Sequence, residues 1–430
     1  MNLRHIFRKD VVLVALSKAV NGTSTLFLNL YAVHFLAPAE FGALTLATTC
    51  LFLLDGMLGA AIDLAVVKLS ADADLTARSA TSAERAAITI KLIACTLAGL
   101  IVVAAAGPLG EILLHRSRVR PLFVAWSVAA TAILVLRSTQ IGLQLRRRFT
   151  AYAAIELTNT TVRISLAVVA LRAGYGSSLA IVICYALSAL VALGIGFSML
   201  IKASSVRSWL GLGGARDLLK ACQTPLLTYS FSSLVSRLDV IILSIAGTPA
   251  QLGIFGSALA VATVPEIAAT YLAPAFLPRI GPYCRQGIFL SFFKRFHLAL
   301  MAVLVPGFVL AAFLVMKAGP YILPPKYSYA LPLIMALLPG TVATASLFPI
   351  SLNFLMLRNS KIFLWNDLVS FPFLIIAYWM AASKGLLSVA LVTTAFRLVK
   401  TVIVQNKALQ LARQARLEGE ETQTLSVAAL

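Results

Sequence analysis

Long apolar runs, separated by short polar segments, fill almost the whole chain of 430 residues. Each run reaches the roughly 20 residues that a helix needs to cross the hydrocarbon core of a bilayer. The runs are 11–36, 42–69, 87–114, 121–145, 151–172, 178–202, 221–247, 251–279, 295–318, 329–357, 362–382 and 385–407. This pattern predicts an all-α, polytopic membrane protein with about 12 transmembrane helices.

The composition supports a chain whose main solvent is lipid. Hydrophobic residues make up 60% of it and charged residues only 12%, about half the charge of a typical soluble domain. The longest polar segments are 71–85, 203–220 and the stretch from 409 onward, and none is long enough for a soluble domain. The first apolar run continues to about Leu36, too long for a signal-peptide core, so we interpret it as an uncleaved first span.

The net charge of +20 is explained by topology. Lys and Arg concentrate in alternate connections, as expected when those connections face the cytoplasm. The distribution places both termini in the cytoplasm, as expected of a multi-pass protein of the cytoplasmic (inner) membrane, and it gives no reason to expect a nucleic-acid partner. One exception is the segment HRSRVR at 115–120, which carries three Arg on the predicted outer side.

Motifs for metal, redox or nucleotide chemistry are weak. The five cysteines and four histidines are scattered and form no CxxC pair, so they predict neither a disulfide framework nor a metal site. The segment GLGG at 211–214 is not followed by GKS or GKT, which argues against a phosphate-binding loop. We therefore expect no cofactor.

A short internal repeat divides the chain near its middle. The turn PAEFG at 38–42 recurs as PAQLG at 249–253, and at the same offset Asp55 corresponds to Glu266. With an even number of spans, the repeat predicts two parallel six-helix lobes around a central cavity. The predicted parts are a first lobe at 1–202, a cytoplasmic linker at 203–220, a second lobe at 221–408 and a cytoplasmic tail at 409–430. The linker could be either an interfacial helix or a plain connection.

Two segments carry a family resemblance. The first reads Phe35, Leu36, Ala37, Pro38, Ala39, Glu40, Phe41, Gly42, matching the form L-x-P-x-E-F/Y-G. The second is SRLDVIILSIAGTPAQLGIFGSALAVA at 236–262, in which Asp239 precedes an apolar run, a short turn and a Gly-Ile-Phe start. Together with the length and span number, they resemble the polysaccharide-transport branch of the multidrug/oligosaccharidyl-lipid/polysaccharide exporter superfamily.

The resemblance implies a flippase, not an enzyme, that moves a polyprenyl-diphosphate-linked oligosaccharide by alternating access. Its product would feed exopolysaccharide, capsule or O-antigen assembly. The expected partners are this cargo, membrane lipids, and the polysaccharide polymerase and export machinery. Two alternatives stay open. One is a multidrug or organic-cation antiporter of the same superfamily, and the other is a membrane enzyme of polysaccharide assembly. The short outer connections disfavour the enzyme.

Positive charges within the predicted spans are the candidates for cargo binding. They are Lys18, Arg137, Arg163, Arg237 and Arg397. A charge at the bilayer centre costs about 2.5–3.5 kcal/mol on insertion scales, and Arg binds phosphate through two parallel hydrogen bonds. Arg163, Arg237 and Arg397 lie roughly midway along their spans. We predict that replacing any one of these three by Ala abolishes transport without preventing insertion. The alternatives are pairing with carboxylates of other helices, and snorkelling of Lys18 and Arg137 toward the cytoplasmic interface.

Acidic residues within the spans are the candidates for ion coupling. They are Asp55, Glu156, Asp239 and Glu266. A transporter driven by a gradient needs a titratable or cation-binding group in its pathway, so we expect a proton or sodium ion at one of them. Structural pairing with an Arg is the alternative. The first span is also unusually polar, as in a cavity wall or a helix contact, because it contains Asn21, Thr23, Ser24, Thr25 and Asn29.

Overall fold

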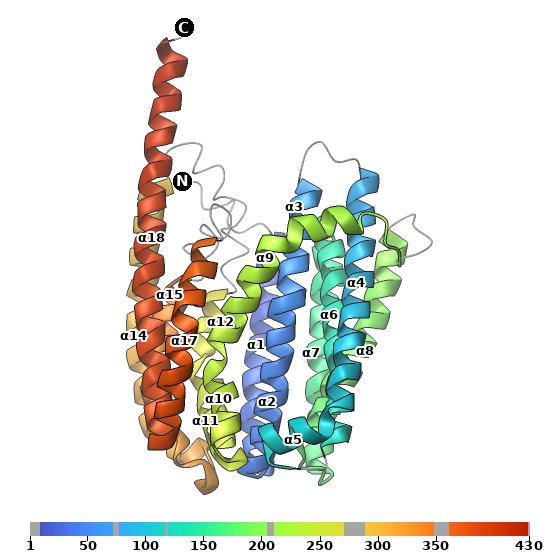
Figure 1. Cartoon of the computed structure of the whole chain (residues 1–430), viewed down its shortest axis with the longest axis vertical. Coiled ribbons are helices and arrows are strands. Elements are labelled where there is room, and N and C mark those ends of the chain that lie inside the picture. Colours follow the sequence, from blue (N-terminus) through green and yellow to red (C-terminus); the bar gives the residue numbers. More distant parts are fainter. Residues whose placement is uncertain are drawn as a thin grey trace. The chain divides into compact units, whose positions relative to one another are not determined.

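The computed structural model describes residues 9–71, 77–116, 119–203, 210–270, 289–347 and 361–428. All elements in these ranges are helices, and Figure 1 shows them as long rods. In chain order they are α1 (Lys9–Phe35), α2 (Pro38–Leu54), η2 (Asp55–Ala60), α3 (Ala61–Ala71), α4 (Ala77–Ala104), α5 (Ala106–Leu114), α6 (Arg120–Leu145), α7 (Phe149–Arg172), α8 (Ser178–Ala203), α9 (Ala215–Ser236), α10 (Leu238–Ala246), α11 (Pro249–Ala262), α12 (Val264–Thr270), α14 (Phe289–Ile322), η3 (Pro325–Tyr327), α15 (Ala330–Leu347), α17 (Lys361–Lys384) and α18 (Leu386–Ala428).

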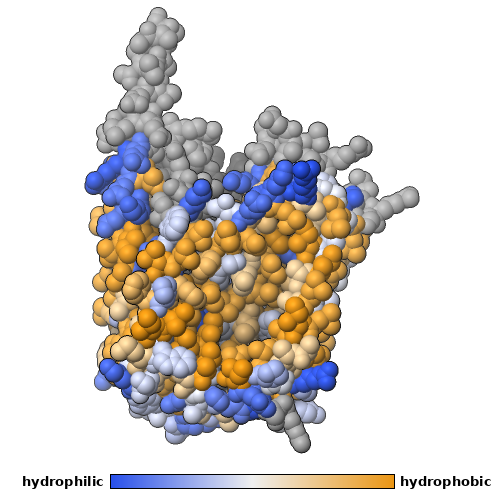
Figure 2. All heavy atoms as spheres, in the orientation of Figure 1, coloured by the Kyte–Doolittle hydropathy of each residue, from blue (hydrophilic) through white to orange (hydrophobic). Residues whose placement is uncertain are grey.

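The helices have the length and composition of membrane spans. Ten of those in the described ranges are long and apolar enough to cross a bilayer, and the bent pair α9 and α10 makes eleven if it counts as one span. The 27 residues of α1 are also enough for a crossing. In the view of Figure 2, apolar side chains cover the middle of the helices and hydrophilic ones gather toward their ends. The prediction of an all-α, multi-pass membrane protein is confirmed.

The chain forms two compact units. One comprises residues 16–257 and 360–385, and the other comprises 1–15, 258–359 and 386–430. In the larger unit α6 packs against α4, α7 and α8, while α17 packs against α9 and α10. In the smaller unit α15 packs against α12, α14 and α18. The division into lobes at 1–202 and 221–408 stays a prediction.

The core of the larger unit is made of aliphatic side chains that interlock between helices. Leu136 and Leu143 of α6, Ile155 of α7 and Leu200 of α8 are buried together in one cluster. The apolar positions of α6 recur at helical spacing, which turns one face of the helix toward its neighbours. This packing holds α6 and α7, which carry several candidate charges, in fixed positions.

Within the described residues, four of the predicted spans are not continuous helices. The second span contains the π-helix Asp55–Ala60, the third is divided at Ala105, the seventh bends by 51° at Arg237, and the eighth is divided at Thr263 between α11 and α12. Apolar content says nothing about such breaks, because each half of a broken helix is as hydrophobic as an unbroken one. π-turns within membrane helices often occur at functional sites.

Two helices continue past the end of the hydrophobic pattern. The helix α9 begins at Ala215, so the last residues of the proposed linker 203–220 are helical. The helix α18 continues to Ala428, so residues 409–428 of the proposed tail continue the helix of the last span. Helix formation needs only intrahelical backbone bonds, and it therefore does not stop where the hydrophobic pattern stops.

Gly56 in the π-helix gives a first testable prediction. A Cβ at this position would lie 2.8 Å from the Cβ of Ser233 in α9, so Gly56→Val is expected to force the two helices apart. Overpacking of this kind costs about 1–3 kcal/mol. The measurement is the loss of folded protein on heating in detergent. Gly194→Val in α8 is the control, because nothing lies within 4 Å of a Cβ there. Equal heat resistance of both variants would contradict the prediction.

Candidate functional site

A polar stripe on α1 faces a buried carboxylate of α7. Lys18, Asn21 and Thr25 follow at spacings of three and four residues, which places them on one face of the helix. The Lys18 Nζ forms an ion pair with Glu156 Oε1 at 2.9 Å, and Asn21 donates a hydrogen bond of 2.7 Å to the same oxygen. Gln140 of α6 donates to the other oxygen at 2.6 Å. The Glu156 carboxylate, only 3% exposed, is thus well satisfied.

Arg163 lies two turns further along α7 from Glu156. Its guanidinium donates two hydrogen bonds of 2.8 Å through Nη2, to Asn21 Oδ1 and to Thr25 Oγ1. It also lies over the ring of Tyr185 in α8, 4.9 Å from the centroid, a favourable cation–π distance. These partners, all neutral, are the ones found in the described part of the chain. Arg163 is 7% exposed, and its Nε is buried without a hydrogen-bond partner there.

Arg137 and Asp55 form the next pair of the network. Arg137 of α6 donates to Asp55 Oδ2 at the start of the π-helix, and it also interacts electrostatically with Asp63 and Glu156. Asp63 in turn pairs with Lys91 Nζ at 2.5 Å, and the Lys91 side chain is fully buried. The charges of α1, η2, α3, α4, α6 and α7 are therefore linked in one region of the larger unit.

Arg237 occupies the break between α9 and α10. Its guanidinium lies over the ring of Phe52 in α2, with 4.4 Å from Cζ to the centroid. Asp239 is 2% exposed, and its Oδ1 accepts a hydrogen bond of 2.8 Å from the N–H of Val240. A carboxylate in the first turn of a helix satisfies free N–H groups and the helix dipole, which gives Asp239 a structural role at the start of α10.

Arg397 and Glu266 belong to the smaller unit and pair with each other. The Nη1 of Arg397 in α18 lies 3.2 Å from Oε2 of Glu266 in α12. Close packing of α15 and α18 supports this position. A Cβ on Gly340 of α15 would lie 2.9 Å from Thr394 Cα and 3.3 Å from Arg397 Cβ. Of the nine candidates named from the sequence, six thus form three ion pairs, namely Lys18 with Glu156, Arg137 with Asp55, and Arg397 with Glu266.

Two residues of this network were not predicted. Gln140 contacts Glu156, and Tyr185 contacts Arg163. A single amide or phenol within an apolar helix is a weak signal, because such groups also occur in ordinary helix contacts. Their helical spacing from known charges, such as Arg137 to Gln140 on α6, is the signal that could have indicated them.

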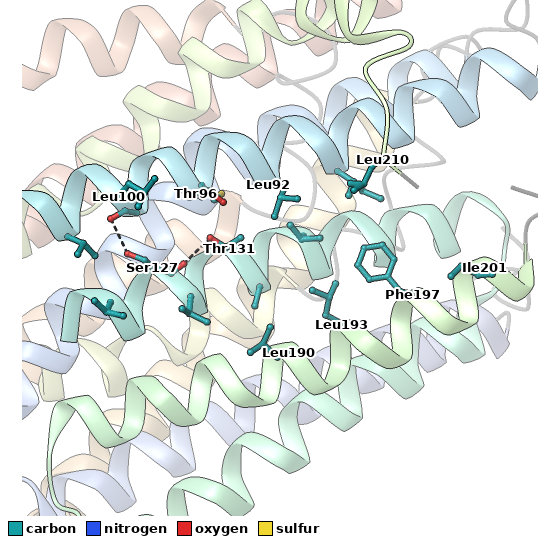
Figure 3. A pocket seen from close by; sticks show the side chains of 18 residues that line it. Leu92, Thr96, Leu100, Ser127, Thr131, Leu190, Leu193, Phe197, Ile201 and Leu210 are labelled. Carbon is teal, nitrogen blue, oxygen red and sulfur yellow. Dashed lines mark hydrogen bonds between the residues drawn. The ribbon is translucent and has the colours of Figure 1, made fainter. Parts of the chain in front are cut away.

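A large cavity of the same unit has no member of the charged network in its lining. This cavity, of about 890 Å³, opens between α4, α6 and α8 and is lined by eighteen residues, none of them charged. Figure 3 shows Leu92, Leu193 and Phe197 facing it. The hydroxyls of Ser127 and Thr131 there donate to backbone carbonyls of their own helix. A cavity lined mainly by apolar side chains suits hydrocarbon better than a phosphate or sugar.

The cations of this network differ in how their charge is compensated. In Lys18, Arg137 and Lys91 the positive charge is already compensated by a carboxylate. Arg163 has only neutral partners in the described chain, so no carboxylate there compensates its charge. A guanidinium has five N–H donors, and the two hydrogen bonds from Nη2 leave those of Nη1 and of Nε, which is buried without a hydrogen-bond partner in the described chain.

Comparison with known proteins places the chain in a family. A model of the family described as polysaccharide biosynthesis protein matches residues 7–283. No curated protein sequence matches this chain.

Solved structures show that the fold is shared. The lipid II flippase MurJ in an inward closed conformation has a TM-score of 0.72 at 13% identity, covering 97% of this chain and 93% of that one. A multidrug resistance transporter of the MATE family in an outward-facing conformation has a TM-score of 0.64 at 14% identity, covering 98% and 99%. A mutant of the Vibrio cholerae MATE transporter VcmN has a TM-score of 0.58 at 14% identity, covering 94% and 97%.

The family match extends over more than half of the chain and includes the PAEFG and PAQLG turns from which the resemblance was inferred. The structural likeness covers almost the entire chain. The protein is therefore a member of the polysaccharide biosynthesis protein family, with the membrane fold that MurJ and the MATE transporters share.

Proposed function

We propose that the protein is a flippase for a polyprenyl-diphosphate-linked oligosaccharide. It moves this cargo across the cytoplasmic membrane by alternating access and supplies the polymerase and export machinery of a surface polysaccharide, such as exopolysaccharide or O-antigen. The observation that carries the proposal is the buried Arg163, whose partners in the described chain are all neutral. A diphosphate is the group of such a cargo that a guanidinium fork recognises best.

The surroundings of Arg163 fit the remainder of this cargo. Asn21 and Thr25 offer amide and hydroxyl groups beside the guanidinium, and Tyr185 offers an aromatic face. Amides and hydroxyls bind sugar hydroxyls, and rings pack against the apolar faces of sugars and cations alike. The membership of a polysaccharide biosynthesis family supports the same cargo class.

An exporter of organic cations is less well supported. Such a cargo favours a carboxylate without a basic partner, yet Asp55, Asp63, Glu156 and Glu266 already form ion pairs with Arg or Lys side chains. Three of these pairs also concern ion coupling. A proton or sodium ion that binds Asp55, Glu156 or Glu266 would have to displace the basic side chain paired with it. We propose this displacement as the coupling step, and Asp239 is the fourth candidate for binding the ion.

Deletion of the coding sequence in the native host tests the proposed function. The expected result is loss of surface polysaccharide, with lipid-linked oligosaccharide retained on the cytoplasmic face of the membrane. Complementation with the wild-type sequence should restore both, which is the control for effects on neighbouring genes. Normal polysaccharide together with new sensitivity to cationic drugs would contradict the flippase and favour the exporter.

A further inference from the structure

The two copies of the internal repeat lie directly against each other in the larger unit. Both begin a helix with proline, Pro38 in α2 and Pro249 in α11. A Cβ on Gly42 would lie 3.0 Å from the backbone N of Gly253 and would overlap the carbonyl oxygen of Pro249. A Cβ on Gly253 would lie 2.9 Å from the backbone N of Gly42 and would overlap the carbonyl oxygen of Pro38. The contact is reciprocal, and each copy contributes the same two positions.

Only glycine permits this approach. Any other residue would place a carbon against backbone atoms, which cannot rotate away as a side chain can. The contact continues one turn further along the helices, where a Cβ on Gly256 would lie 2.8 Å from the Cβ of Thr45. Small residues at such crossings let helix backbones touch in membranes, and the contact can then be closed or separated without rearranging side chains.

The connection that follows α5 contacts both copies of the repeat. His115 Nε2 donates to the carbonyl oxygen of Gly247, just before α11, at 3.0 Å. The adjacent Arg116 forms an ion pair with Glu40 in the first turn of α2. Glu40 also accepts hydrogen bonds from the N–H and hydroxyl of Ser178, at 2.9 and 2.8 Å. Figure 1 shows α5, which leads into this connection, at the same end of the helices as the start of α2.

We infer that the contact of Pro38, Gly42, Pro249 and Gly253, here called the outer latch, closes the end of the larger unit that the charge pattern assigns to the outside. Opening of that end requires the latch to separate. The inference also explains why the segment 115–120 carries Arg residues although it lies on the predicted outer side. Arg116 forms the ion pair with Glu40 beside the latch. The inference goes beyond the proposed function, since it requires no particular cargo.

Thiol labelling tests the latch without any transport assay. The five native cysteines are replaced by Ser, and Thr45→Cys serves as the reporter, because Thr45 is buried beside the latch at 8% exposure. Intact cells are treated with a membrane-impermeant maleimide. The double variant Gly42→Ala, Gly253→Ala is expected to raise the labelling rate about tenfold, since overpacking of this size shifts an equilibrium by about one decade.

The control is Gly107→Ala in α5, at the same end of the helices, where nothing lies within 4 Å of a Cβ. It is expected to leave the labelling rate unchanged. Equal rates in the double variant and the unsubstituted reporter would overturn the inference, and so would a rise of the same size in Gly107→Ala.

If the double variant does not accumulate in the membrane, the variant Glu40→Gln tests the inference instead. It breaks the ion pair with Arg116 and should raise labelling about threefold, as loss of a partly exposed pair implies, whereas an unchanged rate would overturn the latch.

Discussion

Replacement of Arg163 by Ala is expected to abolish cargo translocation while the protein still folds and inserts. Removing one partner of a buried, hydrogen-bonded charge pair costs about 2–5 kcal/mol of binding, which corresponds to a loss of at least about thirtyfold in affinity. The neighbours that lose their bonds, Asn21 and Thr25, are neutral and can hydrogen-bond elsewhere. The measurement is surface polysaccharide in the deletion host complemented with each variant.

Two further variants make the Arg163 test specific. Arg163→Lys keeps the charge but loses the planar fork, so we expect partial activity. Arg172→Ala removes an exposed guanidinium from the outer end of the same helix, where it donates to the hydroxyl of Tyr31 at 3.1 Å, and it should be fully active. Full activity of an inserted Arg163→Ala variant would refute the role of Arg163 in binding and remove the main support for the proposed cargo.

Asp63→Asn is expected to cause the largest loss of stability among single substitutions in the charged network. The variant would leave the ammonium of Lys91 in a fully buried position without its carboxylate. Breaking a buried ion pair by removing one partner costs about 3–5 kcal/mol. The measurement is the fraction of monodisperse protein that remains after heating in detergent.

The matching double variant separates charge from packing. Asp63→Asn combined with Lys91→Met removes both charges, and it should recover most of the stability, because apolar replacements of buried ion pairs are often neutral. Glu111→Gln, at an exposed carboxylate of α5, is the control and should change stability by less than about 0.5 kcal/mol. If Asp63→Asn is no less stable than this control, the pair contributes nothing measurable.

The candidate site was predictable in its members but not in its pairings. The sequence indicated Lys18, Arg137, Glu156 and Asp55 because any charge within an apolar run is conspicuous. It could not indicate that Lys18 pairs with Glu156, 138 residues away, or that Arg137 pairs with Asp55. Those pairs depend on which helices are neighbours and how each is rotated about its axis. The same limit applies to Gln140 and Tyr185, whose importance follows only from their position beside Glu156 and Arg163.

The sequence by itself determined the fold class, the multi-pass membrane character and the family. Transfer of apolar side chains into lipid and the backbone's need for internal hydrogen bonds act locally, so they can be read from one run of residues at a time. It also supplied the repeat of PAEFG and PAQLG. Only the tertiary structure decided that Gly42 and Gly253 touch, that the seventh span breaks at Arg237, and that Arg163 has only neutral partners in the described chain. These features depend on contacts between helices far apart in the chain, which no local pattern of hydrophobicity or charge specifies.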